Sequence, residues 1–183
     1  MEDKIYYLGL DCSSKAIHGV IIDEEENIVG QYKWASKNKS SEQRLLDFSK
    51  DFLAELSTIT YTLFHKEGDP IPRRGQQRKG IQLNHGIKAA VESAIFIQNP
   101  KATIAIASVV GVVRFICMLN GIECCYVDNT KWKRNVVGKG NCSKQDIKAF
   151  ATNKWGDIFK EQDYADAACI ALWRKKERDN GKG

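Results

Sequence analysis

The first third of the chain has the short apolar segments of β-strands. Residues 5–14 (IYYLGLDCSS) form an apolar run that ends at Asp11 and a small polar cluster, which is typical of a buried strand in the middle of a sheet. Residues 16–22 and 27–34 are short and β-rich, and an acidic turn separates them. The three segments together predict an antiparallel meander.

A helix and a second buried strand follow. Residues 42–58 come after Ser40 and place leucine and phenylalanine at helical spacing, so they predict a helix that packs on the sheet. Residues 87–91 are apolar and end at Glu92. This second carboxylate at the end of a predicted strand repeats the pattern at Asp11.

The next segment predicts a long apolar helix. Asn99 and Pro100 supply an N-cap and a first turn, and the apolar residues continue over 101–120 until Gly121. The helix is apolar around most of its circumference, so it must be covered on more than one side, as in a core or an interface. Residues 122–127 then predict another strand.

The C-terminal part predicts helices. Residues 129–140 and 143–153 read as two short helices joined by a glycine-rich basic turn, and residues 163–176 read as a last helix. Asp163 and Asp166 lie three apart at its start, so both side chains project from nearly one face. This order of elements predicts an α/β protein with helices on a mixed sheet, in a single domain over residues 1–183.

Composition predicts a cytoplasmic protein that is not secreted. The apolar fraction of 43% and the charged fraction of 28% are ordinary, and no apolar run is expected to approach the ~20 residues of a membrane helix. The N-terminus has no export pattern. Several of the six cysteines fall in apolar segments, as thiols do in a reducing compartment.

Charge is distributed unevenly along the chain. The net charge is +5, and basic residues cluster at 66–79, 131–144 and 174–178. Such clusters suit a polyanionic partner, although a solvated face is the commoner meaning of one cluster. Residues 66–86 also contain prolines and glycines, which predicts a long basic loop. Candidate phosphate contacts there are Arg73, Arg74, Arg78 and Lys79, and candidates in the second cluster are Lys133, Arg134 and Lys139.

Four carboxylates mark the ends of predicted elements: Asp11, Glu92, Asp163 and Asp166. If the strands before Asp11 and Glu92 are neighbours, the last helix can bring its aspartates to the same edge. Gathered carboxylates repel one another unless divalent cations lie between them, and Mg²⁺ prefers oxygen ligands. Two such ions about 4 Å apart support phosphodiester hydrolysis.

Four segments carry a resemblance to a known family. GLDCSS, AAVESAIFIQNP, VVGKGNCSKQDI and DYADAACIAL resemble, in this order, the four motif regions of the RuvC family of Holliday junction resolvases. The resemblance spans nearly the whole chain. It implies a ribonuclease H-like fold with a five-stranded mixed sheet, and a homodimer that nicks two opposed strands of a four-way DNA junction, with no small-molecule cofactor and no membrane partner.

The resemblance also implies roles for individual residues. Asp11 would be the central metal ligand, Glu92 the second, and Asp163 and Asp166 the carboxylates on the last helix, holding two Mg²⁺ ions that Mn²⁺ can replace. Lys144 matches a basic residue near the scissile phosphate, although a solvated lysine at a helix start is an equal interpretation. The helix over 101–120 corresponds to the dimer helix of the family.

The chain departs from the family pattern at two places. Ile95 stands where the family often carries an aromatic wedge, and Phe96 follows it. Phe96 is either a residue that stacks in an opened junction or a core residue. The basic loop at 66–86 is longer than the corresponding family connection, which suits broader recognition of branched DNA in the nucleoid or on viral DNA.

Two other functions remain open. A different ribonuclease H-like nuclease, acting on flaps, other branched DNA or RNA/DNA hybrids, would use the same carboxylates and metals. A non-catalytic junction-binding protein would keep them as structural residues, but four converging carboxylates would repel a phosphate ligand.

Overall fold

The structure, a computed structural model, describes residues 4–64, 86–93 and 99–181. Within these residues the chain forms five strands and five helices. In chain order they are β1 (Tyr6–Cys12), β2 (Ala16–Ile22), β3 (Ile28–Ala35), α1 (Ser41–Phe64), β4 (Ile87–Glu92), α2 (Pro100–Leu119), β5 (Glu123–Val127), α3 (Asn129–Val136), α4 (Lys144–Trp155) and α5 (Gln162–Asn180).

The strands form one mixed sheet in the order β3-β2-β1-β4-β5. The first three strands pair antiparallel, which confirms the predicted meander. β4 then pairs parallel to β1, and β5 parallel to β4. The long connections between the parallel strands contain α1 and α2, as such crossovers require.

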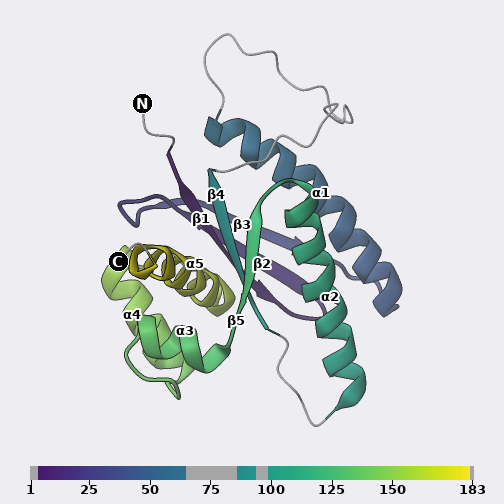
Figure 1. Ribbon diagram of the computed structural model, residues 1–183. Helices are drawn as coiled ribbons and strands as arrows, with labels where there is room; N and C mark the ends of the chain where they lie inside the picture. Colours follow the sequence, from purple (N-terminus) through teal and green to yellow (C-terminus); the bar gives the residue numbers. More distant parts are fainter. Residues whose placement is uncertain (1–3, 65–85, 94–98, 182–183) are drawn as a thin grey trace.

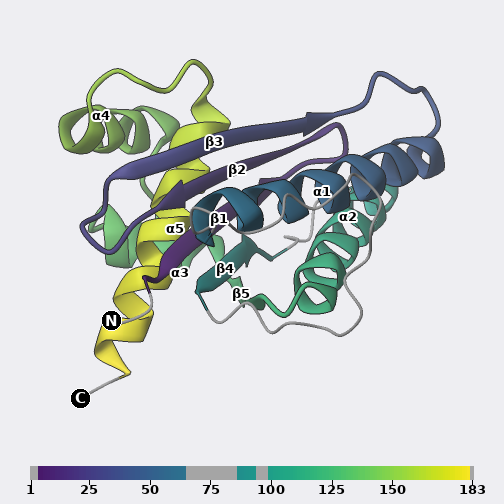
Figure 2. The ribbon, with the colours of Figure 1, turned by 90° about the horizontal axis from the view of Figure 1, so that it is seen from above.

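Helices cover both faces of the sheet (Figures 1 and 2). α1 and α2 pack on one face around alternate residues of β1 such as Leu8 and Leu10. α3, α4 and α5 cover the other face, where Tyr7 and Ala90 meet the small residues of α5. The predicted fold class, a five-stranded mixed sheet with helices on both faces, is confirmed.

Two helices are longer than their sequence patterns predict. α1 continues past Thr58 through the β-branched segment ITYTLF, because Ile59 is buried in the core and Phe64 packs edge-on against Tyr6. α5 continues through the polar residues after 176, because Arg178 forms an ion pair with Glu24. Tertiary contacts therefore determine where α1 and α5 end, and they override local helix propensity.

α2 is more apolar than the sequence analysis expected. It is 20 residues long, with a mean hydropathy of 2.2 over its best 18-residue window, so by length and composition it could cross a membrane. The expectation that no apolar run approaches that length is therefore wrong, because Ser108, Gly111 and Arg114 interrupt the run only singly. Only 28% of that window is buried within the described residues. Length and composition do not separate a membrane span from a helix that a protein partner covers.

Candidate active site

The sheet brings three polar side chains together at the carboxyl ends of two parallel strands. Leu10 of β1 pairs with Val91 of β4, so Asp11 and Glu92 are the next residues on neighbouring strands. His18 of β2 lies directly opposite Asp11 across the antiparallel pair. Because side chains alternate between the faces of a sheet, all three project toward the face that α5 covers.

A glycine lets α5 approach this face closely. A Cβ atom on Gly9 would lie 2.0 Å from the carbonyl oxygen of Ala167 and 2.3 Å from the backbone nitrogen of Ala171. Only glycine fits at such a separation. The start of α5, with Asp163 in its first turn and Asp166 in the next, is thereby held over Asp11.

Asp11, Asp163 and Asp166 form the tightest acidic group at this edge. One carboxylate oxygen from each lies within 4.8 Å of the other two. Burial, followed by the negative charges of Asp166, Glu92 and Asp163, raises the pKa of Asp11 to about 8. Burial also raises the pKa of Asp166, although a hydrogen bond of 3.0 Å from Gln162 opposes this shift.

A divalent cation fits this group. Three carboxylates at such short separations repel one another, and the raised pKa of Asp11 reflects that repulsion and the burial together. Carboxylate oxygens are the ligands that Mg²⁺ and Mn²⁺ prefer. Asp11, Asp163 and Asp166 are therefore the residues that would hold a metal.

Glu92 reaches the same edge but has two protein partners. The side-chain nitrogen of Asn129 donates to its Oε1 at 2.8 Å, and the indole nitrogen of Trp132 donates to its Oε2 at 2.7 Å. Its charge still raises the pKa of Asp11. All four predicted acids thus lie at one edge of the sheet, with Glu92 anchored to α3.

His18 and Glu161 were missed by the sequence analysis. His18 is buried, its Nε2 lies 3.3 Å from Glu161, and its Nδ1 lies 3.6 Å from Asp163. Lys33 pairs with the same Glu161 at 2.6 Å. One signal was available, since His18 is the single polar side chain in the apolar strand segment AIHGVII. Nothing in the sequence indicated that Glu161 would lie beside it.

Lys144 lies at the first position of α4. Ser143 caps this helix and forms a reciprocal pair with Asp146, which fixes the entry of the chain. Lys144 is exposed, and its positive charge acts on both Asp11 and Asp166 to lower their pKa values. The predicted basic residue therefore faces the acidic group.

The other predicted DNA contacts fall into two sets. Lys133 lies on α3 with its ammonium group 5.5 Å from the centre of the Trp132 ring, while Arg134 and Lys139 are exposed nearby in the sequence. No contact joins these three cations to the acidic group among the described residues. The remaining candidates lie outside the described residues: Arg73, Arg74, Arg78, Lys79, Ile95 and Phe96.

Comparison with known proteins identifies the family. The family model described as "Crossover junction endodeoxyribonuclease RuvC" matches residues 76–174, which is more than half of the chain. The chain belongs to the RuvC family. The matched region contains Glu92, Lys144, Asp163 and Asp166, whereas Asp11 precedes it.

A curated RuvC protein supports the assignment over part of the chain. The crossover junction endodeoxyribonuclease RuvC of Brachyspira hyodysenteriae is 32% identical over 84 residues. The alignment covers 46% of this chain and 52% of that protein, so the match spans about half the length of the relative.

Solved RuvC structures share the fold over nearly the whole chain. A Thermus thermophilus RuvC in complex with a Holliday junction substrate matches with a TM-score of 0.71 at 14% identity, covering 97% of this chain and 96% of that one. A second Thermus thermophilus RuvC structure matches with a TM-score of 0.69 at 13% identity and covers 97% of both chains. The ribonuclease H-like fold of the RuvC family is thereby confirmed.

Proposed function

We propose that the protein is a metal-dependent, structure-specific DNA endonuclease that resolves four-way junctions by paired symmetric nicks. One observation carries the proposal: Asp11, Asp163 and Asp166 place three carboxylate oxygens within 4.8 Å at the edge of a RuvC-family sheet. A protein that only bound phosphates would gain nothing from these charges, because they repel its ligand.

Mg²⁺ is the proposed ion, with Mn²⁺ as a substitute, and two ions are proposed for each site. Asp11, Glu92, Asp163 and Asp166 would hold them. Bound there, the metal would activate a water molecule and stabilise the leaving oxygen of a phosphodiester.

The protein side chains supply orientation and charge. Gly9 lets α5 set its two aspartates over Asp11. Lys144, whose charge already acts on Asp11 and Asp166, is the residue proposed to stabilise negative charge that develops at the scissile phosphate.

DNA contacts are proposed for basic residues around this edge. Lys133, Arg134 and Lys139 would contact phosphates, which gives affinity and register without base recognition. The same role is proposed for the arginines and lysine of the 66–86 loop, and stacking in an opened junction for Phe96. Each lost phosphate contact should reduce the salt dependence of binding by about one unit of slope.

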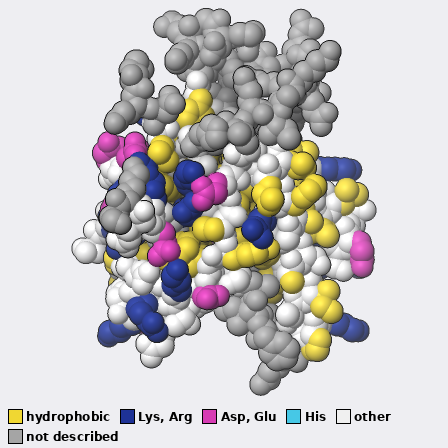
Figure 3. Space-filling view, in the orientation of Figure 1, with side chains coloured by type: hydrophobic (Ala, Val, Ile, Leu, Met, Phe, Trp, Pro, Cys, Tyr) yellow, Lys and Arg dark blue, Asp and Glu magenta, His cyan; other side chains and the backbone are white. Residues whose placement is uncertain are grey.

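A homodimer is proposed through α2. Apolar side chains gather on the side of the molecule that α2 occupies (Figure 3). Four large apolar side chains of α2 are exposed: Ile104, Phe115, Met118 and Leu119. Arg114 disfavours a bilayer as the partner, since a charge in the middle of a membrane helix is costly. A second copy of the chain would cover this face and present two sites to one junction.

Residues 1–183 are proposed to form one nuclease domain, acting in the cytoplasm on chromosomal or viral DNA. The curated relative is matched over about half its length, so its activity supports this proposal without deciding it.

The test is a denaturing-gel cleavage assay on a mobile four-way DNA junction with Mg²⁺, alongside duplex, flap and RNA/DNA hybrid controls. We expect symmetric nicks near the branch point that Asp11→Asn abolishes while junction binding persists. If only the hybrid or the flap is cleaved, the proposed substrate is wrong and the proposed metal site still stands. Junction binding with no metal-dependent cleavage of any substrate would favour the non-catalytic binder.

A further inference from the structure

Glu92 differs from the other acids of the site because both of its oxygens accept hydrogen bonds from one helix. Asn129 donates to Oε1 at 2.8 Å and Trp132 donates to Oε2 at 2.7 Å. Trp132 is fully buried, with 0% of its surface exposed. A buried indole N–H needs an acceptor, and among the described residues Glu92 is its hydrogen-bond partner.

The local fold fixes this arrangement. Asn129 and Trp132 are three apart in α3, so they lie on one face of the helix. The hydroxyl oxygen of Ser93, next to Glu92, lies 3.0 Å from the carbonyl oxygen of Val127 and 3.1 Å from Oδ1 of Asp128, and its single proton is shared between these two acceptors. The end of β4 and the start of α3 are therefore joined by the side chains of both Glu92 and Ser93.

We infer that Asn129 and Trp132 are positioning residues that hold the Glu92 carboxylate for metal binding. The inference rests on the proposed function, in which Glu92 is a metal ligand. Each carboxylate oxygen has about two lone-pair sites, so one hydrogen bond to each leaves sites free for a cation or its water. Residues outside the ligand set that orient the ligands typically change metal affinity when they are removed.

Neutral donors suit this task better than a cation would. Lys33 binds both oxygens of Glu161 at 2.6 and 2.7 Å and brings a positive charge to that carboxylate. A lysine in the place of Trp132 would compete electrostatically with the metal. The indole and the amide orient Glu92 and add no net charge to the site.

The chain offers a matched control. Trp34 donates to Glu55 Oε2 at 2.7 Å, the same length and the same chemistry as the bond between Trp132 and Glu92. Trp34 is 2% exposed and belongs to the core on the opposite face of the sheet. Trp34→Phe and Trp132→Phe therefore remove equivalent bonds, and only the second touches the candidate site.

The experiment measures Ca²⁺ and Mg²⁺ affinity by calorimetry for the wild type, Trp132→Phe and Trp34→Phe in the full chain. We expect Trp132→Phe to weaken binding about 10-fold, within the range for residues that orient metal ligands, and Trp34→Phe to leave it unchanged. Asn129→Ala should act in the same direction, which keeps the test usable if Trp132→Phe does not fold. Unchanged affinity in folded Trp132→Phe or in Asn129→Ala would overturn the inference.

A spectroscopic measurement gives a readout independent of cleavage. In protein labelled with ¹⁵N-tryptophan, the indole N–H resonance of Trp132 is identified by its absence from the Trp132→Phe spectrum. Mg²⁺ should shift this resonance and leave the Trp34 resonance in place. A Trp132 resonance that does not move, in protein that binds Mg²⁺ through Asp11, would overturn the inference and leave the proposed function intact. If Asp11→Asn binds Mg²⁺ as tightly as the wild type, the proposed metal site is wrong, and the inference fails with it.

Discussion

Asp11 and Glu26 have pKa values shifted in opposite directions, and the contrast separates a residue of the candidate site from one that stabilises the fold. Burial and three neighbouring acids raise the pKa of Asp11 to about 8, so its charge is unfavourable without a cation. Burial alone would also raise the pKa of Glu26, but its pairs with Lys154 and Lys175 lower it below the ordinary value. The charge of Glu26 is thus balanced by the protein's own lysines, whereas the charge of Asp11 is disfavoured by its surroundings.

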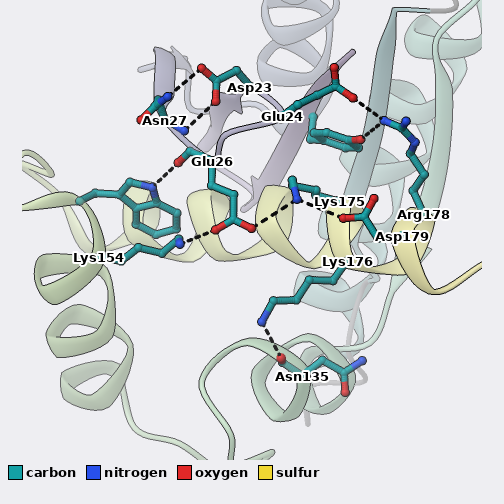
Figure 4. A network of polar contacts seen from close by, with 12 residues as sticks. Asp23, Glu24, Glu26, Asn27, Asn135, Lys154, Lys175, Lys176, Arg178 and Asp179 are labelled. Atoms are coloured by element: carbon teal, nitrogen blue, oxygen red, sulfur yellow. Dashed lines mark hydrogen bonds and ion pairs between the residues drawn. The ribbon is translucent and has the colours of Figure 1, made fainter. Parts of the chain in front are cut away.

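Glu26 joins the turn between β2 and β3 to two helices (Figure 4). It pairs with Lys154 of α4 and, at 3.4 Å, with Lys175 of α5, and Trp155 donates to its backbone carbonyl at 2.7 Å. Its backbone has a φ of +69°, which is strained for a residue with a side chain. These contacts hold an unfavourable turn in place.

Glu26→Gln should lower the free energy of unfolding by about 1 kcal/mol, since partly exposed ion pairs contribute modestly. The pKa of Glu26 is lowered on folding, so its contribution is fully present above the ordinary value of 4.5 and is lost as the pH falls through the folded pKa. Urea unfolding at pH 7 and at a pH below the folded pKa of Glu26 should therefore show a difference between the two proteins only at pH 7. Exposed Glu25→Gln is the control, and an equal loss in both variants would contradict the prediction.

At the scale of elements, the contact between α5 and β1 decides whether the acids meet. β1 supplies Asp11, α5 supplies Asp163 and Asp166, and Gly9 lies where the two elements touch. An added methyl group at Gly9 would meet backbone atoms, which cannot rotate away. The helix would have to move as a unit, and its two aspartates would move with it.

Gly9→Ala should therefore weaken Ca²⁺ binding by at least 10-fold and destabilise the protein by about 1–3 kcal/mol, the usual cost of overpacking. Gly111→Ala is the matched control, because a Cβ there has nothing within 4 Å. It should keep the metal affinity of the wild type. Calorimetry with Ca²⁺ and thermal unfolding measure both effects, and wild-type affinity in Gly9→Ala would show that α5 does not set the site.

At the scale of the whole molecule, the sequence predicts the elements well and their contacts only partly. Asp11 and Glu92 could be found because a carboxylate at the end of an apolar strand is conspicuous. Their adjacency depends on the order of β1 and β4 in the sheet, which local patterns do not determine. From the sequence this adjacency is only a condition for the acids to meet, and the parallel pairing of β1 with β4 fulfils it.

The residues that support the acids could not be predicted in the same way. Trp132 reads as a core residue of a short helix, and His18 as an isolated polar residue in a strand. Their partners, Glu92 and Glu161, are 40 and 143 positions away in the chain. Such pairs follow from packing between distant elements, which one sequence without its relatives does not reveal.

The outer side of α2 carries four of the nine large apolar side chains that are exposed among the described residues. Phe115 is 59% exposed and Met118 is 58% exposed, while Val113 and Ile116 on the inner side are buried. Contiguous exposed apolar surface on one helix marks an interaction site. If a second copy covers it, disrupting this side should separate the two sites without altering either one.

Phe115→Asp combined with Met118→Asp should convert a dimer into a monomer in sedimentation experiments, because each buried charge without a partner opposes association. Ca²⁺ affinity per chain should stay at the wild-type value, since neither residue belongs to the acidic group. On a four-way junction, the wild-type dimer should make two paired nicks in one binding event, whereas the double variant should make only one nick. Leu46→Asp on α1, where Leu46 is 45% exposed, is the control and should remain a dimer. A wild-type protein that sediments as a monomer on its own and on junction DNA would contradict the prediction and leave α2 to another partner.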